Sequence, residues 1–509
     1  MHWGRIFRNV FSNWTSYLVT MLVGFLLAPV IVRSLGDTGY GLWTLIISMT
    51  GYFGLLDLGI RSSVGRFVTR YLALNDEQNV SRTVSTAFAM LACGGLIALL
   101  LTLGITLFVF DGLKVEPHYA TLGRIALIVT GLNMSCALPL GVFSSVLIAL
   151  ERFDVLSGVT VVGELIRGAL VVWALRHGHG LVTLALIALT ITLVQYAAMA
   201  LFAKRLYPPL RIGIRYVNWA GCRDLFGFSI YRFIWMVANQ LIFFSDSIVI
   251  GIFLGAAAIT PFAIASSLIN YGRSIVSLLT DTLYPVAARM DARDDGAGLQ
   301  QLLVLGTRMA LLVTLPLCLG LLFLGRQFIT LWMGPAYADS AVILMVLTIP
   351  QFGSMSQHAS ALVLTGMSRH RALAYIALAE AAANVVLSIV LIQRMGLIGV
   401  AWGTVIPHLI STTVVVPLYT LHVLRMNRAA YLRQAYLRPV LCALPLLALG
   451  YLWVGVDHTS WPRFGAQALA MSGTFGVASY FFCLDRAQRA LISGTVVSMF
   501  HRGVMVHEA

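Results

Sequence analysis

The sequence predicts an all-α polytopic membrane protein of about fourteen transmembrane helices, because it is apolar, poor in charge and divided into long hydrophobic segments. Of the 509 residues, 59% are hydrophobic and 11% are charged, whereas a soluble domain devotes about a quarter of its residues to charge. The apolar windows of about 18–28 residues are long enough for a helix to cross roughly 30 Å of hydrocarbon. Segments of about ten residues with alternating polarity, which a transmembrane β-barrel needs, are absent from the sequence.

The first apolar segment is expected to be a retained helix, because it is too long for the core of a signal peptide and no small-residue cleavage site follows it. The expected spans in chain order are 13–32, 40–60, 83–110, 121–149, 155–175, 181–203, 226–252, 257–285, 302–325, 340–367, 372–393, 398–421, 438–456 and 465–484.

Basic residues are distributed unequally between the two sets of loops. Most of the 34 lysine and arginine residues fall in alternate loops, which predicts a multi-pass protein with both termini in the cytoplasm. The net charge of +14 therefore reports membrane topology and does not indicate a nucleic-acid partner. The longest connection, 204–225, is too short for a soluble domain, so the activity is expected inside the membrane.

A weak internal repeat suggests two related lobes. Glu164 aligns with Glu380 when the chain is shifted against itself, and Leu35-Gly36 aligns with Leu254-Gly255 at a slightly larger shift. The shift spans six helices, and an even number preserves direction, so the lobes would be parallel repeats. The expected parts are an N-terminal lobe at 1–203, a basic cytoplasmic linker at 204–225, a C-terminal lobe at 226–421, two additional helices at 438–484 and a cytoplasmic tail at 485–509.

Several kinds of chemistry are disfavoured by missing motifs. The sequence has no GxxxxGK[ST] loop for a nucleotide and no HExxH or GxSxG motif for hydrolysis. Its 6 cysteines lack CxxC spacing and indicate neither a metal site nor a disulfide framework. We therefore expect no enzyme activity and no cofactor.

Charged residues inside or beside the spans are the positive signal, because a charge in the bilayer costs a few kcal/mol unless it meets water or a partner. Arg273 lies near the middle of a span, where it would bind an anionic group such as a phosphate or pair with Asp246 or Glu380. Glu164 and Arg167 are three residues apart, so a local ion pair is the alternative to a transport role. The candidates for ion coupling are Asp57, Glu164, Asp246 and Glu380, with Glu380 a candidate proton-binding group.

Two segments resemble a known transporter family. Ser34-Leu-Gly-Asp-Thr-Gly-Tyr-Gly-Leu-Trp43 and Tyr52-Phe-Gly-Leu-Leu-Asp57-Leu-Gly59 are similar to the opening of the bacterial polysaccharide transporters, which are Wzx-type oligosaccharide flippases of the multidrug/oligosaccharidyl-lipid/polysaccharide (MOP) superfamily. Asp246, Leu254-Gly255, Pro285 and the segment 366–403 resemble the second-lobe pattern. The sequence departs from the family at Thr260-Pro261, where the family often has a tyrosine, and this puts the geometry of the eighth span in doubt.

The resemblance implies a flippase of the bacterial inner membrane. It would carry an undecaprenyl-pyrophosphate-linked oligosaccharide from the cytoplasmic to the periplasmic leaflet by alternating access, for O-antigen, capsule or exopolysaccharide synthesis. Its partners would be this substrate, membrane lipids and a proton or Na⁺. A glycan polymerase or an export protein is a further partner that the resemblance allows. The expected pyrophosphate-binding residues are Arg61, Arg66, Arg232 and Arg273.

Two other functions stay open at this stage. An ion-coupled multidrug antiporter of the same superfamily would be expected to have an acidic and aromatic site for cationic ligands, so intramembrane arginines argue against it. A membrane glycan polymerase or ligase would be expected to carry a large outer loop with Arg, His or acidic residues, and the outer loops are short.

Overall fold

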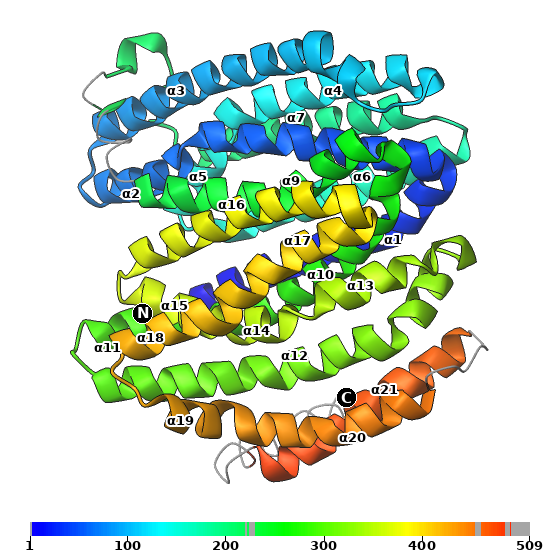
Figure 1. Cartoon of the computed structure of the whole chain (residues 1–509). Coiled ribbons are helices and arrows are strands. Elements are labelled where there is room, and N and C mark those ends of the chain that lie inside the picture. Colours follow the sequence, from blue (N-terminus) through cyan, green and yellow to red (C-terminus); the bar gives the residue numbers. More distant parts are fainter. Residues whose placement is uncertain (1–2, 219–220, 223–229, 454–459, 484–488, 490–509) are drawn as a thin grey trace, which may run out of the picture. The chain divides into compact units, whose positions relative to one another are not determined.

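The computed structural model of the chain describes residues 3–218, 221–222, 230–453, 460–483 and 489, and throughout these residues the regular elements are helices (Figure 1). The side chains of residues 1–11, 13 and 230–232 also lie outside the description. Grouped by contacts, the helices form two compact units, which comprise Met1–Ser267 with His370–His408 and Leu268–Arg369 with Leu409–Ala509. The units interleave in sequence, so they are a different division from the repeat-based lobes, which remain a prediction.

The first unit and its boundary helices contain α1 (Trp3–Gly51), α2 (Ile60–Ala73), α3 (Glu77–Gly104), α4 (Pro117–Leu140), α5 (Val142–Ala149), α6 (Phe153–Arg176), α7 (Leu181–Leu206), α9 (Ile230–Phe253), α10 (Ile259–Thr280), α16 (His370–Met395) and α17 (Leu397–Ile410). Short 3-10 or π turns accompany them at η1 (Tyr52–Asp57), η2 (Ile105–Val109), η3 (Phe110–Gly112), η4 (Ile214–Tyr216) and η5 (Ala256–Ala258).

The second unit contains the end of α10, α11 (Leu283–Asp291), α12 (Gly296–Trp332), η6 (Pro335–Tyr337), α13 (Ser340–Thr348), α14 (Gln351–Ser356), α15 (His358–Gly366), η7 (Ser411–Val415), α18 (Val416–Val423), α19 (Arg428–Tyr431), η8 (Leu432–Leu437), α20 (Arg438–Trp453) and α21 (Trp461–Phe482).

The prediction of a polytopic all-α membrane protein is confirmed. Within the described residues, 11 segments are long and apolar enough to cross a membrane. The expected spans 13–32 and 40–60 fall in one of these segments, Trp14–Ala73, because their helices run together across Gly36. The expected span 340–367 is broken into α13, α14 and α15. The last expected span, 465–484, corresponds to α21, which is less apolar and is not among these 11 segments.

Two glycines that the expected internal repeat aligns lie at backbone turns in the first unit. Gly36 interrupts α1 with φ 68° and ψ 179°, and Gly255 precedes η5 with φ 91° and ψ 172°. This region of φ and ψ is open almost only to glycine, so the conformation explains the residue type at both positions. Thr260, which is fully buried, donates a hydrogen bond from Oγ1 to the Asp37 carbonyl oxygen at 2.8 Å. The departure from the family at Thr260-Pro261 thus leaves an intact α10 that is tied to the turn after Gly36.

The second unit is built around a broken span. Pro350 separates α13 from α14, and Gln357 separates α14 from α15. The buried side chain of Gln357 donates from Nε2 to the hydroxyl oxygens of Tyr431, at 3.1 Å, and Tyr436, at 2.5 Å. Because a broken helix frees polar groups that lipid cannot satisfy, such a network keeps the break stable inside the protein.

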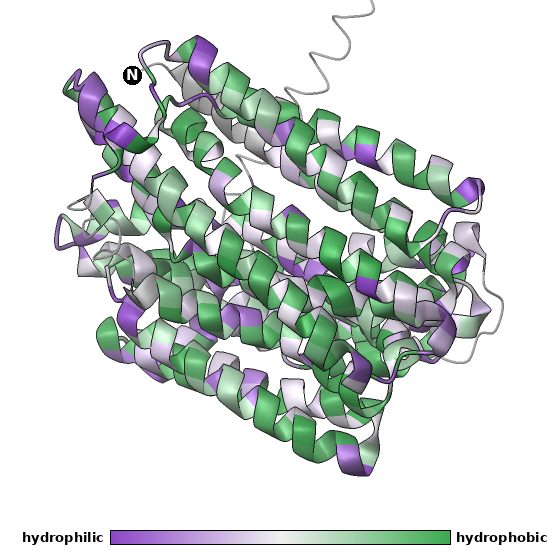
Figure 2. Cartoon of the chain, turned by 90° about the horizontal axis from the view of Figure 1, so that it is seen from above, coloured by the Kyte–Doolittle hydropathy of each residue, from purple (hydrophilic) through white to green (hydrophobic). Residues whose placement is uncertain are grey.

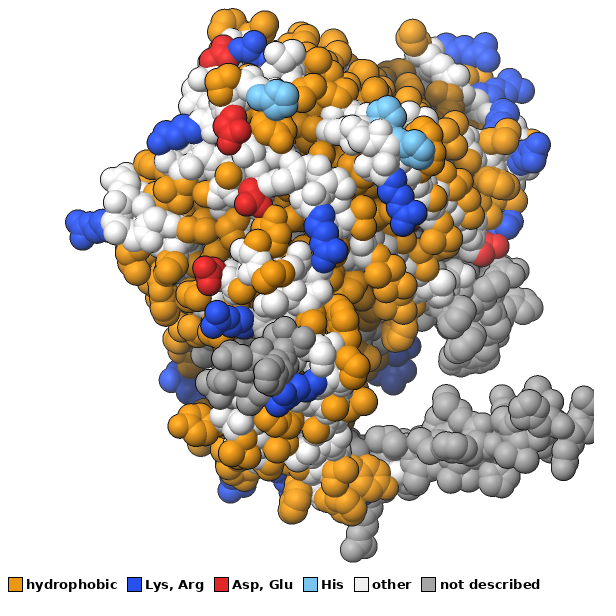
Figure 3. Space-filling view, turned by 90° about the vertical axis from the view of Figure 1, so that its right-hand side faces the viewer, with side chains coloured by type: hydrophobic (Ala, Val, Ile, Leu, Met, Phe, Trp, Pro, Cys, Tyr) orange, Lys and Arg blue, Asp and Glu red, His pale blue; other side chains and the backbone are white. Residues whose placement is uncertain are grey.

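The surface has the pattern expected of a membrane protein. Hydrophobic residues dominate the length of the helices, and hydrophilic residues gather at the helix ends and connections (Figure 2). On the face drawn in Figure 3, charged side chains and histidines are scattered among hydrophobic ones. At one such connection Asp76 caps the start of α3, and hydrogen bonds from the backbone and side chain of Asn79 lower the pKa of the Asp76 carboxyl.

Close packing of α16 and α17 gives a first testable prediction. A Cβ atom on Gly403 would lie 2.5 Å from the Ser388 nitrogen, so the two backbones touch at this glycine. We expect Gly403→Ala to lower the stability of the protein by about 1–3 kcal/mol, as overpacking of an interior does. Gly473→Ala is the matched control, since nothing lies within 4 Å of its added Cβ. Thermal unfolding in detergent measures both, and equal melting temperatures would contradict this contact.

Candidate functional site

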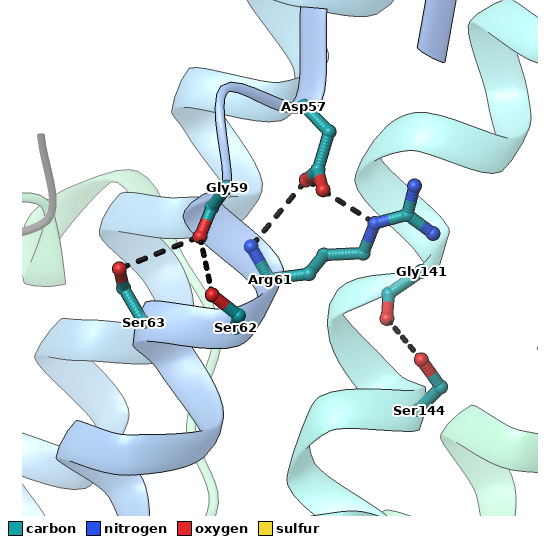
Figure 4. Close-up of polar contacts among 7 residues, drawn as sticks. All are labelled: Asp57, Gly59, Arg61, Ser62, Ser63, Gly141 and Ser144. Carbon is teal, nitrogen blue, oxygen red and sulfur yellow. Dashed lines mark hydrogen bonds and ion pairs between the residues drawn. The ribbon is translucent and has the colours of Figure 1, made fainter. Parts of the chain in front are cut away.

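An ion pair stands at the break between η1 and α2. Leu58 and Gly59 adopt φ values of 51° and 76°, and this left-handed turn carries the chain from Asp57 at the end of η1 into the first turn of α2. Arg61 donates from Nε to Asp57 Oδ1 at 3.2 Å and from its backbone N–H to the same oxygen at 3.4 Å (Figure 4). The Asp57 side chain is 13% exposed and the Arg61 side chain is 32% exposed. The guanidinium is therefore held by a largely buried carboxylate and remains partly accessible.

Gly141, between α4 and α5, holds the other side of Arg61. A Cβ on Gly141 would lie 2.7 Å from Arg61 Nη1 and 3.0 Å from Arg61 Cδ, so the absence of a side chain gives the arginine its place (Figure 4).

We expect Gly141→Ala to displace Arg61 and to reduce transport severalfold. Protein abundance should not change, because the nearest atom, Arg61 Nη1, is at the end of a flexible side chain that can move. Gly158→Ala, whose Cβ would meet nothing within 4 Å, is the control. Transport by both variants is measured beside Arg61→Ala. If Gly141→Ala transports like Gly158→Ala, the position of Arg61 does not matter.

A buried polar stripe joins α9, α16 and α17. Asp246 of α9 is 5% exposed and accepts hydrogen bonds from Thr404 Oγ1 at 2.8 Å and from Ser388 Oγ at 3.4 Å. Ser245 donates to Asn384 Oδ1 at 3.2 Å. In the described part of the chain no lysine, arginine or histidine pairs with Asp246. The carboxylate is thus held by neutral hydroxyl donors, which makes its charge available to a cation.

Glu380 belongs to the same stripe and is joined to a histidine. Glu380, Asn384 and Ser388 are four residues apart in turn, so they share one face of α16. Glu380 Oε1 and His408 Nδ1 of α17 are 2.6 Å apart, and the Glu380 side chain is 8% exposed. A carboxylate and an imidazole at this distance can share or pass a proton.

Arg273 lies in the second unit, within α10. It donates from Nε to Gln351 Oε1 at 3.1 Å, and Gln351 is 3% exposed at the start of α14. Gln351 also donates from Nε2 to the Leu347 carbonyl oxygen at 3.1 Å, which fixes the orientation of its amide. The Arg273 guanidinium is therefore oriented by the residue that begins α14 directly after the break at Pro350.

The remaining predicted residues are on α2, α6 and α9. Glu164 and Arg167 form the local ion pair that was the alternative from sequence, with Oε2 and Nη2 2.6 Å apart on α6. Arg66 is exposed on α2. Arg232 is in the first turn of α9, and its side chain lies outside the described residues.

Sequence reasoning missed four of the partners named above, namely His408, Thr404, Gln351 and Gly141. The four-residue spacing along α16 was visible in the sequence, whereas the partners on α17, α14 and the α4–α5 junction depend on tertiary packing.

Transition-metal chemistry has no support in the described residues, which contain no group of three or more His, Cys, Asp and Glu able to hold a metal ion. The oxygen atoms of Asp246, Thr404 and Ser388 are instead the kind of ligands that hard cations prefer.

Comparison with known proteins identifies the family. A family model described as polysaccharide biosynthesis protein matches residues 6–291, which is more than half of the chain. The chain belongs to this polysaccharide biosynthesis family. The protein is similar to the uncharacterized membrane protein EpsK of Bacillus subtilis, with 22% identity over 95% of this chain and 96% of that protein. It is also similar to the teichuronic acid biosynthesis protein TuaB of Bacillus subtilis, with 25% identity over 57% of this chain and 58% of TuaB.

Solved structures show that this member of the family has the fold of the MOP superfamily. The lipid II flippase MurJ in an inward closed conformation matches with a TM-score of 0.73 and 16% identity over 93% of this chain and 98% of MurJ. An inward-facing multidrug resistance MATE transporter of the MOP superfamily matches with a TM-score of 0.66 and 14% identity over 83% of this chain and 96% of that chain. The sequence-based assignment to the polysaccharide transporter family is confirmed, and the solved structures show the shared fold.

Proposed function

We propose that this protein moves an undecaprenyl-pyrophosphate-linked oligosaccharide from the cytoplasmic to the periplasmic leaflet of the bacterial inner membrane by alternating access, for O-antigen, capsule or exopolysaccharide synthesis. The observation that carries the proposal is the match of residues 6–291 to the polysaccharide biosynthesis family. The fold shared with a lipid II flippase supports it. The transport step needs no covalent chemistry from the protein.

The arginines supply the chemistry for the head group. A pyrophosphate crossing the hydrocarbon region needs cationic groups that replace water, and guanidinium binds two phosphate oxygens at once. Arg61 is positioned by Asp57 and Gly141, and Arg273 by Gln351. We assign these two residues, together with Arg66 and Arg232, to the pyrophosphate.

The buried acids supply the coupling to an ion gradient. We assign proton or Na⁺ binding to Asp246 and Glu380, which face hydroxyl groups and His408 respectively. Asp57 forms an ion pair with Arg61, and Glu164 forms one with Arg167. The contribution of these two acids to ion coupling is therefore indirect, because each holds an arginine in place.

The proposed direction of transport requires a defined topology. The arginine bias predicts that both termini are in the cytoplasm, which would put the turn at 177–180, between α6 and α7, in the periplasm. An alkaline phosphatase fusion after Gly178 should be active, and a fusion at the C-terminus should be inactive. The reverse pattern would invert the proposed direction.

Deletion of the gene tests the proposed function in cells. We expect a lipid-linked oligosaccharide to accumulate on the cytoplasmic face, and the wild-type gene to remove it. The superfamily fold shared with multidrug transporters makes drug export the second candidate. Unchanged lipid-linked glycans with increased drug sensitivity would support that candidate and contradict ours.

A further inference from the structure

A cationic cavity lies in the second unit, and none of the residues assigned above lines it. It has a volume of about 650 Å³ and is lined by Arg369 after α15, and by His422, Arg425 and Arg428 at and beyond the end of α18. The two helices contact each other, which brings these distant segments of the chain together (Figure 1). No acidic side chain is among the residues that line the cavity.

The basic side chains of this cavity lack partners within the described part of the chain. Arg369, His422, Arg425 and Arg428 are exposed, and none of their side chains takes part in a hydrogen bond or an ion pair there. Three guanidinium groups that converge without a carboxylate repel one another, so a bound anion would stabilise them.

The backbone around the cavity is fixed by local hydrogen bonds. Ser368 and Arg425 adopt left-handed φ values of 58° and 50°, which residues other than glycine rarely take. The Arg369 N–H bonds to the Leu364 carbonyl oxygen at 2.8 Å, and the Met426 N–H bonds to the Leu421 carbonyl oxygen at 2.9 Å. These hydrogen-bonded turns position Arg369 and Arg425 so that both line the same cavity.

The position of the cavity along the chain indicates the depth of the ligand. Arg369 directly precedes the apolar segment His370–Met395, Arg425 follows the segment Leu397–Val423, and Arg428 begins the segment Arg428–Trp453. All three arginines thus stand where spanning helices leave the hydrocarbon, which is the level of lipid head groups. Leu418, Leu421 and Met426 line the same cavity and give it an apolar side.

We propose that this cavity binds the phosphate-bearing head group of an anionic membrane lipid, with the arginines on the phosphate and the apolar side chains along the start of the acyl chains. A soluble phosphate has the same charge, but it would leave the apolar side of the cavity without a partner. None of the residues assigned to the pyrophosphate lines this cavity, and the proposal does not depend on which molecule the protein transports.

Lipid binding to the full-length protein in detergent tests the proposal. The probes are phosphatidylglycerol, phosphatidylcholine of the same chain length, and inorganic phosphate, and native mass spectrometry measures the bound fraction. The pocket variant Arg369→Gln/Arg425→Gln/Arg428→Gln should bind phosphatidylglycerol on the order of 100-fold more weakly than wild type, given the usual contribution of each basic residue. The control variant Arg289→Gln/Arg293→Gln/Arg433→Gln removes the same charge at exposed residues outside the cavity and should bind like wild type.

Each outcome decides for or against the site. Equal binding of phosphatidylglycerol and phosphatidylcholine to wild type would overturn the proposal without any variant. An equal loss in the control variant would show general attraction to charge and would also overturn it. Inorganic phosphate that displaces phosphatidylglycerol at equal concentration would replace the lipid with a soluble anion. The lysine variant Arg369→Lys/Arg425→Lys/Arg428→Lys keeps the charge and should retain most of the binding.

Discussion

Replacing Arg273 with alanine should reduce export of the lipid-linked oligosaccharide to background while the protein stays abundant in the membrane. The alanine removes the guanidinium that Gln351 orients by a 3.1 Å hydrogen bond, and a pyrophosphate in the membrane then loses a cationic partner. Arg273→Lys keeps the charge but loses the planar fork that holds two oxygens, so it should export at an intermediate rate. Export and abundance are measured in the same cells.

Gln351 gives this prediction a second arm. Gln351→Leu keeps the volume of the buried side chain and removes the acceptor of the Arg273 Nε–H, so export should fall less than in Arg273→Ala. The pairing of Arg273 with Asp246 that the sequence also allowed is not formed, so a purely structural arginine would act through Gln351 and would predict low abundance of Arg273→Ala. An abundant Arg273→Ala protein that exports at the normal rate would contradict both roles.

Neutralising the buried acids should uncouple transport from the ion gradient. Asp246→Asn keeps one acceptor oxygen, enough for one of the Thr404 and Ser388 hydroxyls, and removes the charge that a cation would bind. Glu380→Gln removes the carboxylate next to His408. We expect both variants to remain folded and to lose most gradient-driven export, because an ion that cannot bind cannot drive the conformational change.

Export across a series of external pH values and Na⁺ concentrations separates the two acids. If export by Glu380→Gln no longer depends on pH, the proton binds at the Glu380–His408 pair. If export by Asp246→Asn no longer depends on Na⁺, the cation binds at Asp246 in the buried polar stripe. Normal export by both variants under every condition would show that these acids are structural.

The sequence predicted the fold class because hydrophobic segment length is a local property. The loop expected between the spans 13–32 and 40–60 contains the break at Gly36, because glycine adopts backbone conformations that other residues avoid. The sequence did not show that the expected span 340–367 forms three short helices, because the network of Gln357 with Tyr431 and Tyr436 joins residues far apart in the chain.

The candidate site was predictable residue by residue but not in its pairings. A charge inside an apolar segment is conspicuous, so Asp246, Arg273 and Glu380 were found from sequence alone. Their partners Thr404, Gln351 and His408 are ordinary polar residues in or beside other spans, and only the packing of α9, α16 and α17, and of α10 with α14, selects them.

Reconstitution of the purified protein tests the central claim most directly. The protein is placed in vesicles of phosphatidylglycerol and phosphatidylcholine that carry an undecaprenyl-pyrophosphate-linked oligosaccharide, and an impermeant glycan-modifying reagent reports how much of it reaches the outer leaflet. The account predicts that an imposed proton or Na⁺ gradient makes inner-leaflet oligosaccharide accessible with the wild-type protein and not with Arg273→Ala. Accessibility that is the same with wild type, with Arg273→Ala and with protein-free vesicles would contradict the account.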